Sequence, residues 1–256
     1  PGYYFHDLNT KLNYKFSEKS RLYLSLYTGK DQAYLKMKES YENNEYESNF
    51  KLKWGNVTTA LRWNYKITNK LFSNTTLTYS RFQFLTALDF KETSDNSSEQ
   101  IGFEYSSGID DLTGKVEFDF VPDPDHYIRF GASVIDHTFN PGVNAFQFSV
   151  TDEFDLDTTF GNKKIYSREW DAYIEDDFAV TEKFKANCGL HFSVFDVNNN
   201  LYSSLEPRIS LRYKLSDNWS VKAAYTNMSQ YIHLLTNSNI GMPTDLWLPV
   251  TDTIKP

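Results

Sequence analysis

Alternation of apolar and polar side chains is the feature that most limits how this chain folds. Between Tyr4 and Phe16 every second residue belongs to a mostly apolar set, whereas the intervening residues after Phe5 are Asp, Asn or Lys. The same alternation recurs over residues 128–134, 184–194 and 208–215. A period of two residues is that of a β-strand with one apolar face, and helical spacing explains none of these segments. The sequence therefore predicts an all-β chain.

The connections between these segments alternate between short and long. Short polar turns are expected at 17–20, 68–70, 122–126, 181–183 and 216–218, and longer polar segments lie at 36–47, 91–98, 143–164 and 198–203. This parity predicts about ten antiparallel strands, with tight turns at one end and long loops at the other. We therefore expect an antiparallel transmembrane β-barrel segment with short periplasmic turns and long extracellular loops, whose strands cross the bilayer in about 9 to 11 residues.

Aromatic residues, which make up 17% of the chain, support this interpretation. Eight of them lie within a few residues of a short turn: Tyr14, Phe16, Phe72, Tyr127, Phe178, Phe184, Tyr213 and Trp219. We expect them to form an aromatic girdle at one membrane interface. The apolar phase shifts by one residue near Gly55 and again at 110–114, and we predict a glycine-associated β-bulge at each place.

Charge and cysteine content exclude several classes of protein. The formal net charge is −8 and no long cluster of Lys or Arg occurs, which argues against nucleic acid as a partner. The single cysteine, Cys188, has no partner for an internal disulfide. The five histidines are scattered, with no pair at i, i+4, so no zinc site is predicted.

One acidic stretch raises a metal hypothesis. Alternate carboxylates at 151–157 could share a calcium ion, the candidate ligands being Asp152, Glu153, Asp155 and Asp157. The stretch lacks the glycine turn and the twelfth-position glutamate of a calcium loop. A solvated acidic loop is therefore the favoured reading, and calcium is the alternative.

No motif indicates covalent chemistry. No serine lies in a G-x-S-x-G sequence, and no Ser, His and Asp set can be grouped. Asp176 and Asp177 are adjacent, so they fall on opposite faces of a predicted strand, one facing the lumen and one facing outward. We assign the pair to the membrane interface, and we predict no enzyme activity, no catalytic residue and no cofactor.

Four segments carry a resemblance to a known family. They are "FHDLNTKLNYKFSEKSRLYLSLYTGKD", "WGNVTTALRWNYKITNKLFSNTTLTYSRF", "AYIEDDFAVTEKFKANCGL" and "SLEPRISLRYKLSDNWSVKAAYTNMSQYIHLLTNSNIGMPTDLWLP". The chain resembles the barrel of TonB-dependent outer-membrane receptors of the Bacteroidetes type. The resemblance implies that residues 1–256 are part of a single outer-membrane β-barrel domain, with the plug domain, the signal peptide and the C-terminal strands lying outside this sequence.

The resemblance also implies a function. Such a receptor imports a scarce nutrient, such as a metal chelate, a vitamin, a glycan or a peptide, across the outer membrane. The implied partners are the TonB energy-transducing complex, which would act through a plug that this chain does not contain, the outer-membrane lipid, the imported small ligand and, as a further candidate, a surface lipoprotein.

The last segment, residues 231–256, reads as an extracellular loop cut before its return strand. Polar and aromatic side chains near it could line a ligand vestibule at the extracellular rim. The candidates are Gln230, His233, Asn237, Asp245 and Trp247. The competing interpretation is that Pro243, Trp247 and Pro249 pack this long loop onto its neighbours.

Two rival hypotheses come from other classes of protein. In the first, the chain is a soluble or surface-anchored β-structural adhesin or binding module, whose apolar strand faces form a core between two sheets. In the second, it is an outer-membrane barrel enzyme with a nucleophile in the lumen or at the rim. Partition into detergent separates the receptor from the first rival, and labelling by an active-site probe separates it from the second.

Overall fold

The fold is known from a computed structural model, which describes residues 1–95, 97–151, 154–161, 163–237, 244–251 and 253–256. It consists of β-strands, and no helix among the described residues is long and apolar enough to cross a membrane. The strands are β1 (Gly2–Ser17), β2 (Ser20–Tyr41), β3 (Asn44–Lys66), β4 (Leu71–Thr93), β5 (Ser98–Asp123), β6 (His126–Val150), β7 (Phe154–Phe160), β8 (Ile165–Ala179), β9 (Phe184–Val197), β10 (Asn200–Lys214), β11 (Ser220–Thr226), β12 (Ile232–Asn237) and β13 (Thr244–Pro249).

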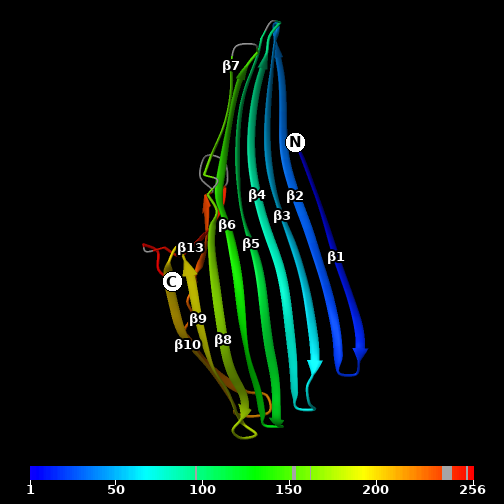
Figure 1. The fold of residues 1–256 in the computed structure, drawn as a ribbon, viewed down its shortest axis with the longest axis vertical. Helices are drawn as coiled ribbons and strands as arrows, with labels where there is room; N and C mark the ends of the chain where they lie inside the picture. Colours follow the sequence, from blue (N-terminus) through cyan, green and yellow to red (C-terminus); the bar gives the residue numbers. More distant parts are fainter. Residues whose placement is uncertain (96, 152–153, 162, 238–243, 252) are drawn as a thin grey trace.

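Ten of these strands form one continuous antiparallel path, in the order β1-β2-β3-β4-β5-β6-β8-β9-β10-β11 (Figure 1). β7 pairs with β6 beside this path, and β12 and β13 form a separate two-stranded sheet. Each strand of the path thus pairs with the next strand along the chain, apart from the lateral β7. The predicted all-β antiparallel barrel segment is confirmed, and its sheet is open, because β1 and β11 do not pair with each other.

The connections keep the predicted parity but differ in form at the far end. Five short turns follow β1, β3, β5, β8 and β10 at one end of the sheet (Figure 1). At the other end the polar segments 36–47 and 91–98 mostly continue the paired strands rather than leaving the sheet. Residues 198–203 also differ from the expected loop, because β9 and β10 are joined by a two-residue turn with positive φ at Asn198 and Asn199.

The register defines two faces of the sheet. Side chains that are directly opposite each other lie on the same face, so Leu24, Leu61 and Leu77 form one row across β2, β3 and β4. We call this the outer face, and the opposite one, which carries Lys115 and Glu117, the inner face. Along each strand of the path, successive residues alternate between the two faces.

The two predicted bulges are wrong, because strand pairing is continuous both at Gly55 and through 110–114. The apolar phase shifts there for another reason. After Gly55 in the sequence, the apolar side chains of β3 lie on the outer face, as Val57 does. Before Gly55 they lie on the inner face, as Trp54 does. A register shift does occur nearby in β5, between Ser106 and Gly108.

The aromatic girdle is confirmed in part. Phe72 and Tyr127 lie on the inner face, since each neighbours an outer-face residue in its strand, Leu71 and Ile128 respectively. Tyr14, Phe16, Phe178, Phe184 and Tyr213 lie on the outer face near the short turns. Trp219 is 73% exposed in the last short turn. The girdle therefore contains fewer rings than the sequence suggested.

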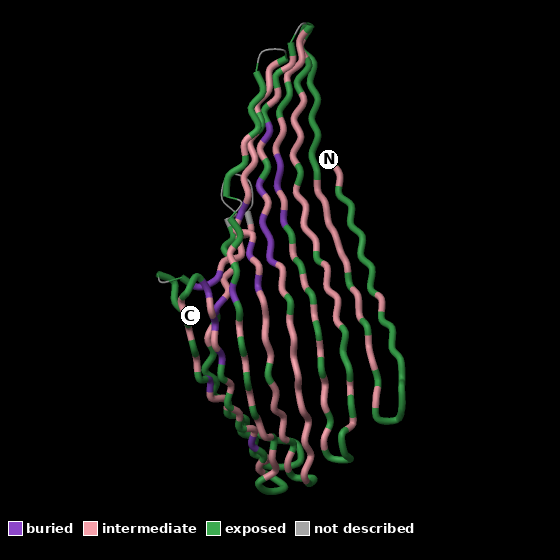
Figure 2. Tube along the Cα trace, in the orientation of Figure 1, coloured by how far each residue is buried: buried purple, intermediate pink, exposed green. Residues whose placement is uncertain are grey.

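Buried residues concentrate in the part of the sheet against which the β12–β13 hairpin lies (Figure 2). β13 contacts β4, β5 and β6, and the chain leading into β12 reaches β9. A small apolar cluster forms where these elements meet: Phe195, Val197, Tyr231 and Val250. The final segment thus folds back over the inner face instead of projecting away from the sheet.

Candidate functional site

The outer face carries an uncharged apolar band that is bounded by ion pairs. At the turn end, His126 Nδ1 lies 2.7 Å from Asp176 Oδ2. At the other end, Arg168 Nε lies 2.5 Å from Asp136 Oδ1. Asp176 and Arg168 are eight residues apart on β8, which corresponds to about 26 Å along a strand.

Large apolar side chains between these limits are exposed. Leu77 is 56% exposed, Leu112 56% and Ile174 55%. A soluble protein does not leave so extended an apolar surface uncovered, whereas the lipid-facing band of an outer-membrane barrel is about 25 Å tall. The band therefore fits the hydrocarbon layer of a membrane. Asp176 and Asp177 were predicted to lie on opposite faces with the outward one at the membrane interface, and the register shows that Asp176 is the outward one.

The inner face at the same level is polar and ion-paired. Arg129 lies 2.5 Å from Glu175, and Tyr173 donates a 2.8 Å hydrogen bond to Glu117, which also pairs with Lys115 at 2.8 Å. These groups come from adjacent strands, because the register brings β5, β6 and β8 together here. A face of this kind suits a hydrated lumen.

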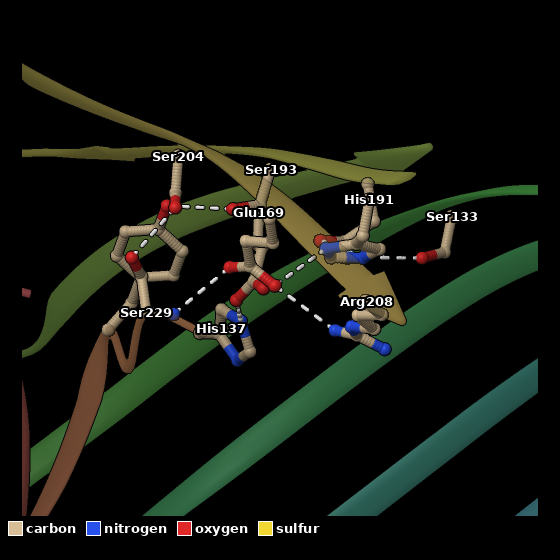
Figure 3. A network of polar contacts seen from close by, with 11 residues as sticks. Ser133, His137, Glu169, His191, Ser193, Ser204, Arg208 and Ser229 are labelled. Carbon is tan, nitrogen blue, oxygen red and sulfur yellow. Dashed lines mark hydrogen bonds and ion pairs between the residues drawn. The ribbon is translucent and has the colours of Figure 1, made fainter. Parts of the chain in front are cut away.

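A second polar cluster lies on the inner face farther from the short turns, on β6, β8, β9 and β10 (Figure 3). His191 Nδ1 lies 3.1 Å from Glu206, its Nε2 lies 3.5 Å from Asp171, and Asp171 accepts a 3.1 Å hydrogen bond from Ser133. Arg208 donates to Glu206 at 3.0 Å. Glu206 is only 3% exposed, so a buried carboxylate is the centre of this cluster.

The chain after β11 is attached to this cluster. The backbone N–H of Ser229 donates a 3.0 Å hydrogen bond to Glu206 Oε1, and the hydroxyl of Ser229 donates to that of Ser204 at 2.8 Å (Figure 3). Two residues later, the Tyr231 hydroxyl lies 2.8 Å from that of Ser193. These contacts direct the chain away from β10 and across the inner face.

A third polar group completes the inner face. His137 is 3% exposed, and its Nδ1 lies 2.7 Å from Asp111. Its Nε2 lies 3.6 Å from Glu169, an ion-pair distance that is too long for a hydrogen bond. The His137 ring is also packed 6.0 Å from that of Phe195, which links this group to the apolar cluster under Tyr231.

The hairpin places the predicted rim residues against the inner face. The Trp247 ring packs edge-to-face on Phe82 with centroids 6.3 Å apart, and the Asp245 carbonyl accepts a 3.5 Å hydrogen bond from Tyr105 and another from Ser107. Asp245 and Trp247 lie on one face of the hairpin, because they are directly opposite Thr236 and Leu234. The packing that the competing interpretation expected for Trp247 is thus present.

The other candidates lie nearby but are not all brought together. His233 is paired with Leu248 on the hairpin's other face, Asn237 ends β12, and Gln230 donates a 2.8 Å hydrogen bond to the Ile232 carbonyl. Two ring nitrogens, His233 Nε2 and Trp247 Nε1, are buried and have no hydrogen-bond partner among the described residues. Ligand binding by these five residues stays a prediction.

The calcium hypothesis can be followed only in part. Asp152 and Glu153 lie outside the described residues, whereas Asp155 and Asp157 are exposed on β7. Within the part of the chain that the structure describes, no group of three or more His, Cys, Asp or Glu side chains could hold a metal ion.

Sequence reasoning missed the inner-face clusters. The alternation places three residues in the polar set of a predicted strand: His191, Glu206 and Arg208. Their position on the polar face was therefore predictable from the sequence. What was missing was the register, because residues 198–203 read as a loop. The tight turn at Asn198–Asn199 places His191 directly opposite Glu206.

An uncharged band of membrane thickness outside and ion-paired groups inside define the class: this is part of an outer-membrane β-barrel. The sequence matches the family "TonB dependent receptor-like, beta-barrel" over residues 1–232, and the chain belongs to that family. The receptors of this family are outer-membrane proteins.

Several solved structures are similar to the chain. The ferripyoverdine receptor of Pseudomonas aeruginosa is 12% identical, with 93% of this chain and 39% of the receptor covered and a TM-score of 0.49. The ferric preacinetobactin receptor BauA of Acinetobacter baumannii is 9% identical, with 96% and 48% covered and a TM-score of 0.42. The ferric citrate transporter FecA is 12% identical, with 86% of this chain and 40% of the transporter covered and a TM-score of 0.39. The chain thus spans less than half the length of these receptors, and no curated protein matches it.

Proposed function

We propose that the chain is the barrel portion of a TonB-dependent transporter of the Bacteroidetes type, which imports a scarce nutrient across the outer membrane. The nutrient would be a metal chelate, a vitamin, a glycan or a peptide. The observation that carries the proposal is the pairing of a lipid-sized apolar outer band with a charged inner face in a chain of this family. Residues 1–256 would form one part of a single barrel domain.

The inner face supports this role through its chemistry. Its ion pairs and hydroxyl groups offer donors and acceptors to a polypeptide, as the attachment of Ser229 to Glu206 illustrates. A plug domain from outside this sequence would lie against such a face, and the TonB complex would act on that plug. Outer-membrane lipid would cover the apolar band, and a surface lipoprotein would meet the far end of the sheet.

We further propose that Gln230, His233, Asn237, Asp245 and Trp247 contribute to ligand binding at the extracellular rim. Support comes from the buried, unpartnered nitrogens of His233 and Trp247, since buried polar groups usually have a partner. The indole N–H of Trp247 is a donor, and the imidazole nitrogen of His233 is a donor or an acceptor according to its tautomer. Such groups can bind polar groups of a small ligand. We propose no catalytic role for any residue.

Uptake measurements test the transporter proposal. A strain lacking the gene is supplied with ferric chelates, cobalamin, oligosaccharides and peptides, and the uptake of each class is compared with that of the parent. We expect uptake of one class to fall, to return with the intact gene, and to stay low when TonB is absent. Unchanged uptake of all four classes, or uptake that does not need TonB, would contradict the proposal.

Substitution of Trp247 tests the rim separately. We expect Trp247→Ala to weaken binding of the imported ligand by at least about tenfold, in line with the loss of one aromatic contact and one donor. Trp219→Ala is the matched control, because Trp219 lies in a short turn at the opposite end of the sheet. Equal affinities for both variants would overturn the assignment of Trp247 while leaving the transporter proposal standing.

A further inference from the structure

Several cationic side chains gather on the outer face directly beyond the apolar band. Thr28 and Val57 are the last uncharged pair of the band on β2 and β3, and the next outer-face pair is Lys30 with Gly55. The pair after that contains Lys53, and the next contains Lys51. Lysines at successive outer-face positions therefore stand where the sheet leaves the hydrocarbon layer.

Among the described residues these lysines form no ion pair, whereas the nearby arginine does. Arg81, on the neighbouring strand β4, lies 3.4 Å from Asp110. No ion pair within the described residues involves Lys30, Lys51 or Lys53. Glu104 is the carboxylate that acts on Lys53, and it is the smallest of the influences on that group.

The charges also repel one another. Burial lowers the pKa of the Lys53 ammonium, and the nearby ammonium groups of Lys30 and Lys51 lower it further. Holding like charges close together destabilises the fold, and an anion bound between the ammonium groups would reduce their repulsion. Lys30, Lys51 and Lys53 therefore form a local concentration of positive charge.

A cavity is present at the same place. Its volume is about 370 Å³, and its lining includes Lys30, Lys53, Arg81 and Gly55. A Cβ added at Gly55 would lie 2.8 Å from the Gly29 carbonyl oxygen, so a larger residue cannot be accommodated without a shift of the backbone. Glycine at this position keeps the floor of the cavity open.

We propose that this lysine pocket, lined by Lys30, Lys53 and Arg81 with Lys51 one outer-face position beyond Lys53, binds the phosphate group of an anionic lipid of the outer leaflet. Phosphate oxygens accept charge-assisted hydrogen bonds from lysine and arginine. The pocket is on the face whose apolar band meets lipid, one residue pair beyond that band, which is the level of the headgroups. A lipid can therefore place its acyl chains against Leu61 and Leu77 while its phosphate occupies the pocket. The inference is independent of which nutrient the receptor imports.

Lipid binding to the purified receptor tests the proposal. The detergent-solubilised receptor carrying residues 1–256 is titrated with bisphosphorylated lipid A and, separately, with zwitterionic phosphatidylethanolamine, and bound lipid is counted by native mass spectrometry. The variants are Lys30→Gln/Lys53→Gln and the charge-conserving Lys30→Arg/Lys53→Arg. The matched control is Lys19→Gln/Lys183→Gln, which makes the same charge change in two short turns at the opposite end of the sheet.

We expect the glutamine double variant to bind lipid A at least tenfold more weakly, and the arginine variant and the turn control to bind it as the parent does. Phosphatidylethanolamine binding should be equal in all four proteins. Unchanged lipid A binding by the glutamine variant would overturn the proposal, as would an equal loss in the turn control. Displacement of lipid A by an equal concentration of inorganic phosphate would also overturn it, because the site would then serve a free anion. A change in heat-modifiable gel mobility identifies a misfolded variant, in which case Arg81→Gln replaces it and must weaken lipid A binding.

Discussion

The ring of Tyr231 stacks on the ring of Phe195, with centroids 4.9 Å apart and planes inclined by 2°. Phe195 is a fully buried residue of β9, and Tyr231 belongs to the segment that leads into the β12–β13 hairpin. The contact therefore attaches the last part of the chain to the inner face, together with the hydrogen bond between the Tyr231 and Ser193 hydroxyls. Its strength determines how firmly the hairpin lies over the lumen.

Tyr231→Ala should detach the hairpin, because loss of a buried aromatic side chain costs about 3–5 kcal/mol locally. Tyr231→Phe keeps the ring and loses only the hydroxyl contact with Ser193, which is worth about 1 kcal/mol. We expect limited proteolysis within residues 232–249 to be much faster in the alanine variant and nearly unchanged in the phenylalanine variant. Equal cleavage rates in the parent and the alanine variant would show that the hairpin is held elsewhere.

Glu206→Gln should destabilise the inner face. The carboxylate accepts hydrogen bonds from Arg208 and from the Ser229 N–H, and the amide replaces one of its acceptors with a donor. We expect a loss of about 1.5–3 kcal/mol, the range for a hydrogen bond to a charged group. The loss of stability is measured as a shift in the denaturant concentration at which half of the reconstituted receptor is unfolded. Glu18→Gln, which breaks an exposed turn pair with Lys15, serves as the control and should leave the midpoint in place.

Gly131→Ala should also lower stability, for steric reasons. The new Cβ would lie 2.6 Å from the Val116 carbonyl oxygen and 3.1 Å from the Tyr173 ring. We expect a cost of about 1–3 kcal/mol from the forced backbone shift. At Gly114 the nearest atoms would be 3.7 Å and 3.8 Å away, so Gly114→Ala is the matched control and should be close to neutral. A larger effect at Gly114 than at Gly131 would contradict the packing described here.

The alternation of side chains predicted strands well because lipid demands apolar groups on one face of every strand that crosses it. The alternation misled near Gly55 and Leu112, because apolar side chains are no longer required on the outer face where the strand leaves the lipid. Beyond that level Trp54 and Ile109 face inward, and Ile109 is buried there, so the apolar phase reverses without a bulge. A phase reversal in such a sequence therefore indicates the membrane boundary.

The candidate site was less predictable, since it depends on how distant segments meet. Ser229 bonds to Glu206, 23 residues earlier, only because the chain turns inward after β11. Nothing in the sequence around Ser229 indicates that turn, and the segment after it read as an open loop. The lysine pocket likewise arises from the register of β2 on β3, which places Lys30 beside Gly55.

The pair of His126 and Asp176 at the turn end of the band should respond to pH. The hydrogen bond that His126 donates to the Asp176 carboxylate raises the pKa of His126, with Asp123 and Asp125 adding to the effect. Because the folded-state pKa lies above that of the unfolded chain, the contribution of this pair to stability is fully present below the unfolded value and is lost as pH rises through the folded one. The pair therefore stabilises the receptor more on the acid side.

Modification of His126 by diethyl pyrocarbonate, followed by mass spectrometry across a pH series, measures this pKa. We expect Asp176→Asn to move the midpoint to lower pH. Asp177→Asn is the matched control, because Asp177 lies on the opposite face of β8 and should leave the midpoint unchanged. An unchanged midpoint in Asp176→Asn would show that the hydrogen bond does not control the titration.

Site-directed spin labelling of β4 in the membrane-reconstituted receptor tests the central claim most directly. Cys188 is first replaced by Ser, and single cysteines are then labelled at Thr75, Thr76, Leu77 and Thr78, where the register predicts alternate outer and inner faces. We predict high collision rates with oxygen at Thr75 and Leu77 and with a water-soluble nickel chelate at Thr76 and Thr78, a period of two that reports lipid outside and a hydrated lumen inside. Equal accessibility at all four positions, or labels at Thr75 and Leu77 that neither reagent reaches, would contradict a lipid-facing band and favour a soluble β-structure with a protein core.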